Sequence, residues 1–506
     1  MKRILSIILA LLLVVSMTAC KKEPADSNDA TTSTTQITDT PTTTPTNAPA
    51  NTPTTVPTTA PSNTPATTPT TVPGNTPDTT PTTAPTTAPT NPSHTSHTFG
   101  NWTVKTAASC KKEGVEVRRC SGCSATETRP IAKTAHNLNA QNICKKCYYV
   151  EFDENAPLVE LGVICDNWYE SGSMATYPWD IKAWNGKVYR GAGDYDKNSG
   201  ATTILAYDTA THTWDTSYKA KDEAIHGFVE INGTLCAPGI DAQESWTYGN
   251  YYSLDSKGNW QKIRNLPNGV HNFDMIESNG KIFAGLGTET VGDTVAVSSD
   301  GGKTFTFAPL YKDGNPYDLS KFDHSRTYEF TTLNGTVYAL IALYPTSGAT
   351  VWGIYRYEDG KMHYMAEGRT LLDGTEFSRK YFGGSFEMNG TCYLTARRLY
   401  AIQDFSNPSS WQSISMPNSG KVSDAILRDG VIYVLSSRQN KDKTYHTIIY
   451  KSTTGQPGSF EEFATYDYSG FPLSFDFDGT HFYIGTSSNS LDKSKIGMVL
   501  RVKPNG

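Results

Sequence analysis

The segment Ile276-Glu-Ser-Asn-Gly-Lys-Ile-Phe283 contains a short motif that recurs along the C-terminal two thirds of the chain. The motif reads apolar-x-x-Asn/Asp-Gly-x-apolar-aromatic. Asn-Gly or Asp-Gly between alternating apolar runs predicts a two-residue β-hairpin, because both turn residues need a positive φ. The seven copies have their glycines at Gly186, Gly233, Gly280, Gly335, Gly390, Gly430 and Gly479.

The spacing of these glycines indicates the fold class. Successive glycines are separated by 47, 47, 55, 55, 40 and 49 residues, and each repeat can be written as four strands. Repeats of this length with four strands each are typical of β-propeller blades. We therefore expect residues 151–506 to form an all-β, seven-bladed β-propeller of four-stranded blades.

The number of strand-like runs predicts how this ring closes. The last repeat has three such runs, whereas an extra run, Leu158–Ile164, precedes the first repeat. An N-terminal strand that pairs into the last blade removes the open edge of the sheet. We expect Leu158–Ile164 to provide the missing fourth strand.

Composition limits the classes of function. The 506-residue chain has 44 Lys+Arg against 50 Asp+Glu, a net charge of −6, which lacks the basic excess of a nucleic-acid-binding protein. Neither a Gly-x-Ser-x-Gly nor a His-Glu-x-x-His motif occurs, so the sequence assigns no catalytic residue. We expect a monomer with no nucleic-acid partner.

Residues 1–20 form the pattern of an export signal. A basic start is followed by the apolar run Ile4–Val15 and by small residues before Cys20. The cysteine after Thr-Ala resembles the lipobox of bacterial lipoproteins, although Met17 stands where that family usually has Leu. The resemblance implies cleavage before Cys20, lipidation of its thiol and anchoring to the extracytoplasmic face of the cell membrane. The alternative is an ordinary secretory signal.

Residues 21–93 are rich in Thr, Pro, Asn and Ala and have almost no large apolar residues. Such a segment cannot bury enough apolar surface to fold, and its prolines favour extended polyproline II. We predict a disordered stalk. At about 3.1 Å per residue it could reach roughly 220 Å from a membrane.

Residues 94–150 hold five of the nine cysteines, with Cys-x2-Cys pairs at Cys120/Cys123 and Cys144/Cys147. Two such pairs can provide the four ligands of one tetrahedral zinc ion. A small segment with few apolar residues needs such a metal ion or disulfides to fold stably. The segment resembles zinc-ribbon-like modules in secreted proteins of anaerobic bacteria, on His97-x2-Gly-x-Trp102, Cys110 and His136. The resemblance leaves another ligand set open, namely His97 or His136 with Cys110, Cys120 and Cys123. Disulfides are the competing interpretation, because the chain carries an export signal.

The turn Ser298-Ser-Asp300-Gly-Gly302-Lys-Thr304-Phe305 resembles the Asp-box of sialidase-type propellers, with degenerate copies at Asp208, Asp255 and Asp404. In such a turn the Asp side chain accepts backbone N–H bonds and the aromatic residue packs between sheets. The Asn-Gly-x-apolar-Tyr strands are also similar to kelch repeats, whose double glycine is missing here. We expect these residues to be structural.

Candidate ligand-binding residues lie six or seven positions before the hairpin glycines, or just upstream of those positions, where the first strand of each blade enters the central channel. Aromatic faces beside acids, His and Arg are suited to the apolar faces and hydroxyls of sugars. The predicted binding residues are Tyr177, Trp179, Asp180, His226, His271, Asp274, Arg326, Tyr328 and Asp424.

Two functions remain open from the sequence. The first is a surface binding protein whose propeller holds a glycan or a partner protein. The second is a glycoside hydrolase or lyase that uses a pair of acids from Asp180, Asp274, Glu329 and Asp424. A close carboxyl pair in a deep cleft favours hydrolysis, whereas acids scattered around an open mouth favour binding.

Overall fold

The fold is taken from a computed structural model, which describes residues 96–162, 174–194, 200–368, 384–418, 420–487 and 493–505. The predicted signal peptide, the predicted lipidation site Cys20 and the predicted stalk at 21–93 lie outside the described residues, as does Cys165. No helix in the described part of the chain is long and apolar enough to cross a membrane.

Residues 96–150 contain a small antiparallel sheet with the order β1-β2-β3. Its strands are β1 (Thr103–Thr106), β2 (Gly114–Arg119) and β3 (Thr126–Ile131). The β2 and β3 strands pair without a register shift from Gly114↔Ile131 to Arg119↔Thr126. The two turns of this sheet therefore lie at opposite ends of β2.

The later strands form four-stranded antiparallel meanders, so the described chain is all-β as predicted. Two meanders, β5–β8 and β10–β14, comprise β5 (Ile181–Trp184), β6 (Lys187–Arg190), β7 (Thr203–Asp208), β8 (Thr213–Lys219), β10 (Val229–Ile231), β11 (Thr234–Pro238), β13 (Tyr248–Leu254) and β14 (Trp260–Pro267). Two more, β25–β28 and β29–β32, comprise β25 (Ser385–Met388), β26 (Thr391–Thr395), β27 (Leu399–Ile402), β28 (Gln412–Ile414), β29 (Lys421–Arg428), β30 (Val431–Gln439), β31 (Tyr445–Ser452) and β32 (Glu461–Tyr468).

The β15–β18 and β21–β24 meanders are joined into one larger sheet. They comprise β15 (His271–Ser278), β16 (Lys281–Thr288), β17 (Val295–Ser298), β18 (Thr306–Phe307), β21 (Phe322–Leu333), β22 (Thr336–Pro345), β23 (Val351–Glu358) and β24 (Lys361–Glu367). Strand pairing joins them through Gly287↔Arg326 and Thr288↔Ser325 of β16 and β21. The short strands β9 (Asp222–Ala224), β12 (Ile240–Ala242), β19 (Leu310–Lys312) and β20 (Asn315–Pro316) extend its edges.

The last sheet combines strands from distant parts of the sequence. Its order is β33-β34-β35-β4, with β33 (Phe471–Phe477), β34 (Phe482–Ser487), β35 (Val499–Val502) and β4 (Leu158–Gly162). The β4 strand pairs antiparallel with β35 through Leu158↔Val502 and Val159↔Arg501. The described part of the run that the strand count singles out, Leu158–Gly162, therefore pairs with the C-terminal strand.

The predicted hairpin turns have the backbone that Asn-Gly requires. In six of them both turn residues have positive φ, from Asn185 at 48° and Gly186 at 74° to Asp429 at 48° and Gly430 at 74°. The exception is the copy at Gly479, where Phe477 pairs with Phe482 across a four-residue loop. There the Asp478 carboxylate accepts the backbone N–H groups of Thr480 and His481, both at 2.7 Å. A side-chain acceptor thus replaces the two-residue turn.

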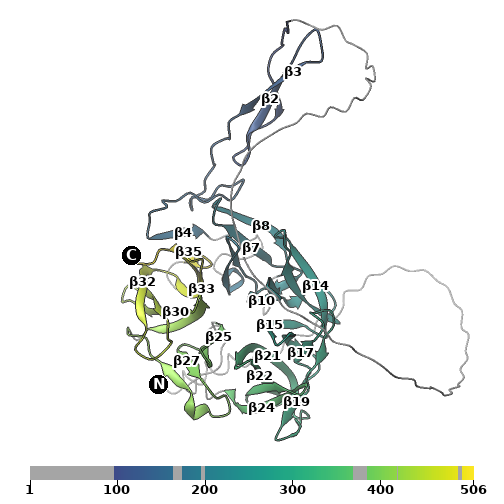
Figure 1. The fold of residues 1–506 in the computed structure, drawn as a ribbon, viewed down its shortest axis with the longest axis vertical. Helices are drawn as coiled ribbons and strands as arrows, with labels where there is room; N and C mark the ends of the chain where they lie inside the picture. Colours follow the sequence, from purple (N-terminus) through teal and green to yellow (C-terminus); the bar gives the residue numbers. More distant parts are fainter. Residues whose placement is uncertain are drawn as a thin grey trace, which may run out of the picture. The chain divides into compact units, whose positions relative to one another are not determined.

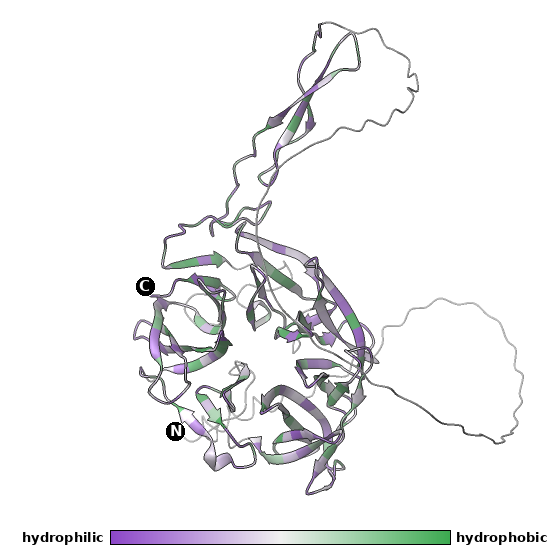
Figure 2. Ribbon diagram, viewed as in Figure 1, coloured by the Kyte–Doolittle hydropathy of each residue, from purple (hydrophilic) through white to green (hydrophobic). Residues whose placement is uncertain are grey.

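Apolar side chains pack between adjacent sheets. One cluster joins Tyr189 of β6, Leu235 of β11 and Trp260 of β14, and another joins Val188 of β6 with Tyr483 of β34. Figure 2 shows hydrophobic residues on the strands of the sheets. Figure 1 shows these sheets arranged around a common centre, which is the arrangement of a β-propeller.

Candidate functional site

A cavity of about 440 Å³ lies at the common centre of the sheets. Residues of β5, β10, β15, β21, β25, β29 and β33, the first strand of each meander, line this cavity. The predicted residues that line it are Trp179, Asp180, His226, Asp274, Tyr328 and Asp424. The hairpin spacing therefore located the entry positions of the inner strands.

Tyr177, His271 and Arg326 are not among the lining residues. Tyr177 is buried and contacts the Trp179 ring at 5.4 Å between centroids. The Nδ1 atom of buried His271 lies 3.4 Å from the Asp241 carboxylate. The Arg326 guanidinium lies over the Phe273 ring at 5.9 Å. All three residues therefore contact aromatic rings of the lining, Tyr177 at Trp179 and the other two at Phe273.

Three acids of the lining, Asp274, Glu329 and Asp424, reach the cavity through β-bulges in the inner strands. The register shifts between Asn272 and Asp274 in β15, between Thr327 and Glu329 in β21, and between Val422 and Asp424 in β29. A similar shift precedes Ser474 in β33. A bulge inserts one residue and re-aims the side chain that follows, so these bulges bring corresponding residues to the same wall.

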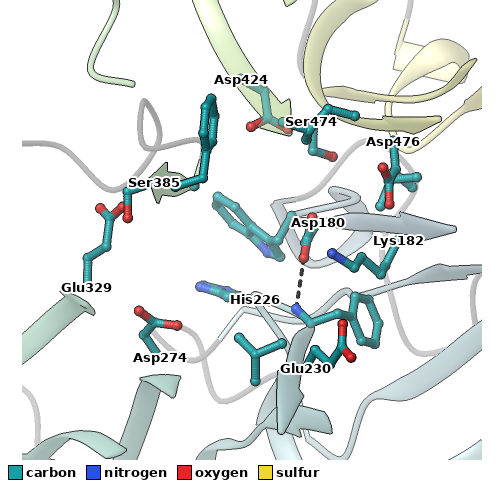
Figure 3. Close-up of a pocket in the computed structure, with 18 of the residues that line it drawn as sticks. Asp180, Lys182, His226, Glu230, Asp274, Glu329, Ser385, Asp424, Ser474 and Asp476 are labelled. Carbon is teal, nitrogen blue, oxygen red and sulfur yellow. Dashed lines mark hydrogen bonds between the residues drawn. The ribbon is translucent and has the colours of Figure 1, made fainter. Parts of the chain in front are cut away.

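Three of the acids bind the neighbouring inner strand. The Asp180 carboxylate accepts the Phe228 N–H at 2.8 Å (Figure 3). The Asp274 carboxylate accepts the Phe330 N–H at 2.7 Å, and that of Asp424 accepts the Phe475 N–H at 3.0 Å. The second oxygen of Asp274 accepts the Met275 N–H, and that of Asp424 accepts the Ala425 N–H, both at 2.8 Å. These carboxylates therefore hold adjacent sheets together as well as lining the cavity.

Glu329 differs from these three acids. Both of its carboxyl oxygens are buried without a hydrogen bond of normal geometry to the described residues. The hydroxyl of Ser385, which lies next to it in Figure 3, donates to the Phe330 carbonyl at 3.0 Å. Among the four acids, Glu329 thus contributes least to the hydrogen bonds that hold the sheets together.

Burial raises the pKa values of all four acids, because desolvation disfavours the charged form. It raises the pKa of Asp180 to about 6, although the nearby Lys182 ammonium opposes the rise, and that of Asp274 to about 7. Burial and then repulsion by Asp274 hold the pKa of Glu329 well above its usual range. Burial and then repulsion by Asp180 do the same for Asp424. Near neutral pH the wall contains both protonated and ionised carboxyl groups.

Cations and aromatic rings complete the lining. Asp476 pairs with the Arg428 guanidinium, whose Nε donates at 3.0 Å, and also accepts the Ala183 N–H at 2.9 Å. The rings of Trp179 and His226 lie 4.4 Å apart, and the Trp179 indole N–H donates to the Gly193 carbonyl at 2.8 Å. The sequence prediction missed Asp476 and Arg428, because they lie only three and two residues before their hairpin glycines.

This arrangement is better suited to binding than to hydrolysis. A glycosidase needs two carboxyl groups free to act as an acid and a base or nucleophile. Here Asp180, Asp274 and Asp424 already bind backbone N–H groups of neighbouring strands. The aromatic face of Trp179 and the mixed carboxyl groups instead provide stacking and hydrogen bonding for a polar ring.

The Asp-containing turns lie outside this lining. The Asp300 carboxylate accepts the N–H groups of Lys303 and Thr304, both at 3.0 Å, and the hydroxyls of Ser298 and Thr304. These hydrogen bonds, led by those from Thr304, hold the pKa of Asp300 below its usual range. Phe305 is buried against Tyr251 at 6.5 Å between centroids. The contacts of this turn are structural.

The cysteines of residues 96–150 form two clusters. Cys110, His136, Cys144 and Cys147 bring their donor atoms within 4.8 Å of one another, and so do His97, Cys120 and Cys123. All five cysteines are unbridged. The structure therefore corrects the predicted site of Cys120, Cys123, Cys144 and Cys147, because the two Cys-x2-Cys pairs belong to different clusters. The alternative that combines Cys110 with Cys120 and Cys123 is wrong for the same reason.

No model of a known protein family matches the chain, and no curated protein matches it. Comparison with solved structures gives similarity to polysaccharide lyase Uly1, with 10% identity over 66% of this chain and 91% of the lyase, at a TM-score of 0.39. BamB from Moraxella catarrhalis has 11% identity over 64% of this chain and 96% of its own, at a TM-score of 0.33. The β-propeller domain of the Trilobed protease from Pyrococcus furiosus has 12% identity over 71% and 92%, at a TM-score of 0.31.

Proposed function

We propose that this protein is a lipid-anchored, extracytoplasmic binding protein whose propeller takes a saccharide in its central cavity. The observation that carries the proposal is the cavity of about 440 Å³ with Trp179 beside buried carboxyl groups. Small-molecule sites are typically about 300–1,000 Å³, which suits one or two sugar rings better than the surface of a protein. The partners are thus the membrane, through Cys20, and an extracellular glycan.

The scaffold in this proposal is a closed ring of seven blades. Each of the meanders forms one blade, and β4 beside β35 forms the closure. Closure completes the fourth strand of the last blade and leaves only short sheet edges, which helps to keep the cavity preformed. The lipid on Cys20 and the stalk at 21–93 hold this platform away from the membrane. The module at 94–150 serves as a metal-stabilised spacer.

Binding is tested with the full-length chain, solubilised in detergent, on a glycan array followed by calorimetry on the glycans retained. Trp179→Ala removes the aromatic face and is expected to weaken binding at least tenfold. Trp411→Ala is the matched control, since Trp411 is not among the cavity-lining residues and its indole donates to the Asp404 carbonyl. Failure of the wild-type protein to retain any glycan contradicts the proposal. Equal affinity of the two variants contradicts the assigned cavity.

A second function, glycan cleavage, is favoured by one feature. Glu329 is a buried carboxyl group with a strongly raised pKa, as a general acid requires, and lies near the ionisable Asp274. Glu329→Gln distinguishes the two functions, because the amide keeps the shape of the side chain but cannot transfer a proton. We expect glycan affinity to change less than threefold and no shortened product to form with either protein. Products that form with the wild type and disappear in the variant would establish an enzyme.

A further inference from the structure

We propose that residues 96–150 bind two zinc ions at two separate sites, of which one is closed by four protein ligands and the other has three. This inference rests on the proposal that the module binds metal, and it goes beyond that proposal in the number and kind of sites. The closed site comprises Cys110, His136, Cys144 and Cys147, and the three-ligand site comprises His97, Cys120 and Cys123.

The closed site has the dimensions of a tetrahedral zinc shell. Bond lengths of about 2.3 Å for Zn–S and about 2.0–2.1 Å for Zn–N place two sulfurs about 3.8 Å apart and a sulfur and nitrogen about 3.5 Å apart. The Cys110 and Cys144 sulfurs are 3.9 Å apart, and the Cys147 sulfur lies 3.3 Å from His136 Nδ1. Three thiolates and one imidazole fill the shell, as in structural zinc sites.

The three-ligand site has the same spacing with one donor fewer. The Cys123 sulfur lies 3.3 Å from His97 Nδ1, and Cys120 shares the cluster. His97 is exposed and Cys123 is partly exposed, whereas Cys144 and Cys147 are buried. The fourth position of this ion is therefore open to water or to another ligand, so the ion exchanges more readily than its neighbour.

The geometry of β2 prevents one ion from holding both groups. Cys110 precedes β2 and Cys120 follows it, and β2 runs extended from Gly114 to Arg119. An extended strand rises about 3.3 Å per residue, so the ends of β2 are separated by roughly 17 Å. No single ion spans that distance with bonds of about 2.3 Å.

The closed site fastens the module to the β5–β8 meander. Cys144 and Cys147 begin the turn that leads to Tyr149, and the His136 ring stacks on the Tyr149 ring at 4.2 Å. Tyr149 pairs with Thr213, and the Val150 N–H donates to the His212 carbonyl at 2.8 Å. Loss of the ion at the closed site should loosen this junction.

The three-ligand site fastens the opposite end of β2. Phe99 pairs with Cys120, and the Ser121 N–H donates to the Thr98 carbonyl at 3.0 Å. The ion would hold the segment at His97 against the turn between β2 and β3. Its loss should unfasten this segment while the junction near Tyr149 stays intact.

The number of ions is the direct test. The full-length chain, purified without oxygen, is analysed for zinc per polypeptide by native mass spectrometry and elemental analysis. We expect two ions in the wild type, one in Cys144→Ala and one in Cys120→Ala. Cys236→Ala is the matched control, because Cys236 is buried in β11 outside both clusters, and it should keep two.

Other counts overturn the inference in distinct ways. One ion in the wild type and none in either variant would establish a single shared site. No ion and only one titratable thiol at the five positions would establish two disulfides and refute metal binding altogether. Neither result bears on glycan retention by the cavity, so the failures of the two proposals can be told apart.

A spectrum of the cobalt-loaded chain identifies the donors even if a variant loosens the fold. Thiolate-to-cobalt charge-transfer absorption grows with the number of thiolates, which is three at the closed site and two at the other. Cys120→Ala should therefore retain more than half of the wild-type absorption. Equal losses in Cys120→Ala and Cys144→Ala, each to zero, contradict two sites.

Discussion

Replacing Asp274 by Asn should make the stability of the propeller less sensitive to pH. Burial raises the pKa of Asp274 from 3.8 to about 7. The folded protein then binds this proton more tightly than the unfolded chain, so stability decreases as pH rises from about 4 to about 7. A shift of about three units corresponds to roughly 4 kcal/mol, an order-of-magnitude figure.

The substitution also has a structural cost. The Asp274 carboxylate accepts one N–H from Phe330 and one from Met275, and an amide can accept only on its oxygen side. Losing one of these hydrogen bonds costs about 1–3 kcal/mol. Asp274→Asn should therefore be less stable than the wild type near pH 4.5 and more stable by about 1–3 kcal/mol at pH 8.

Chemical denaturation of both proteins at four pH values between 4.5 and 8.5 measures this crossing. Glu289→Gln is the control, because it removes one negative charge from an exposed position. Its difference from the wild type should change little with pH. Parallel stability curves for Asp274→Asn and the wild type would refute the argument, since an ionisable group buried at a folding cost must reveal that cost between pH 4 and 7.

Three further substitutions test contacts of the scaffold. Trp214→Ala removes a buried ring and its hydrogen bond to the Leu161 carbonyl of β4, and should lower the free energy of unfolding by roughly 3–5 kcal/mol in denaturant titrations; an unchanged midpoint contradicts the contact. Asp300→Ala removes the acceptor of the β17–β18 turn and should lower the melting temperature without altering glycan affinity; a loss of affinity instead would place this turn in the binding site. Asn389→Ala places a Cβ-bearing residue without a polar side chain at a φ of 52° and should cost about 1–2 kcal/mol, whereas Asn389→Gly should be close to neutral by calorimetry.

Local sequence patterns were sufficient to predict the hairpins and strands of the sheets. Asn-Gly requires a particular backbone wherever it occurs, so the turn at Asn185 could be predicted from two residues. The pairing of β4 with β35 could be predicted because the last repeat lacks one strand and an extra strand precedes the first repeat. The positions of Asp274 and Asp424 followed from their spacing to the hairpins, although the bulges that aim them into the cavity have no recognisable signal.

The cysteine clusters could not be predicted in the same way. The two Cys-x2-Cys pairs have a spacing typical of one zinc site, but a spacing does not say how the chain between them runs. That chain includes β3 and a long return to Cys144, and the return places Cys144 beside Cys110. Whether Cys144 and Cys147 lie near the start or the end of β2 depends on the tertiary structure. The spacing of cysteines in the sequence cannot predict it.

Most of the acids both line the cavity and hydrogen-bond to the next inner strand. This limits which substitutions can test ligand binding without also changing stability. Asp180, Asp274 and Asp424 line the cavity, and each also binds the next inner strand, so replacing any of them changes stability and the cavity together. Glu329 lines the same wall without such a hydrogen bond. Because a buried carboxyl group lowers stability unless strong hydrogen bonds compensate it, the fold alone gives no reason to keep Glu329 there. Glu329 is therefore the acid whose replacement by Gln should stabilise the propeller without removing a hydrogen bond between two inner strands.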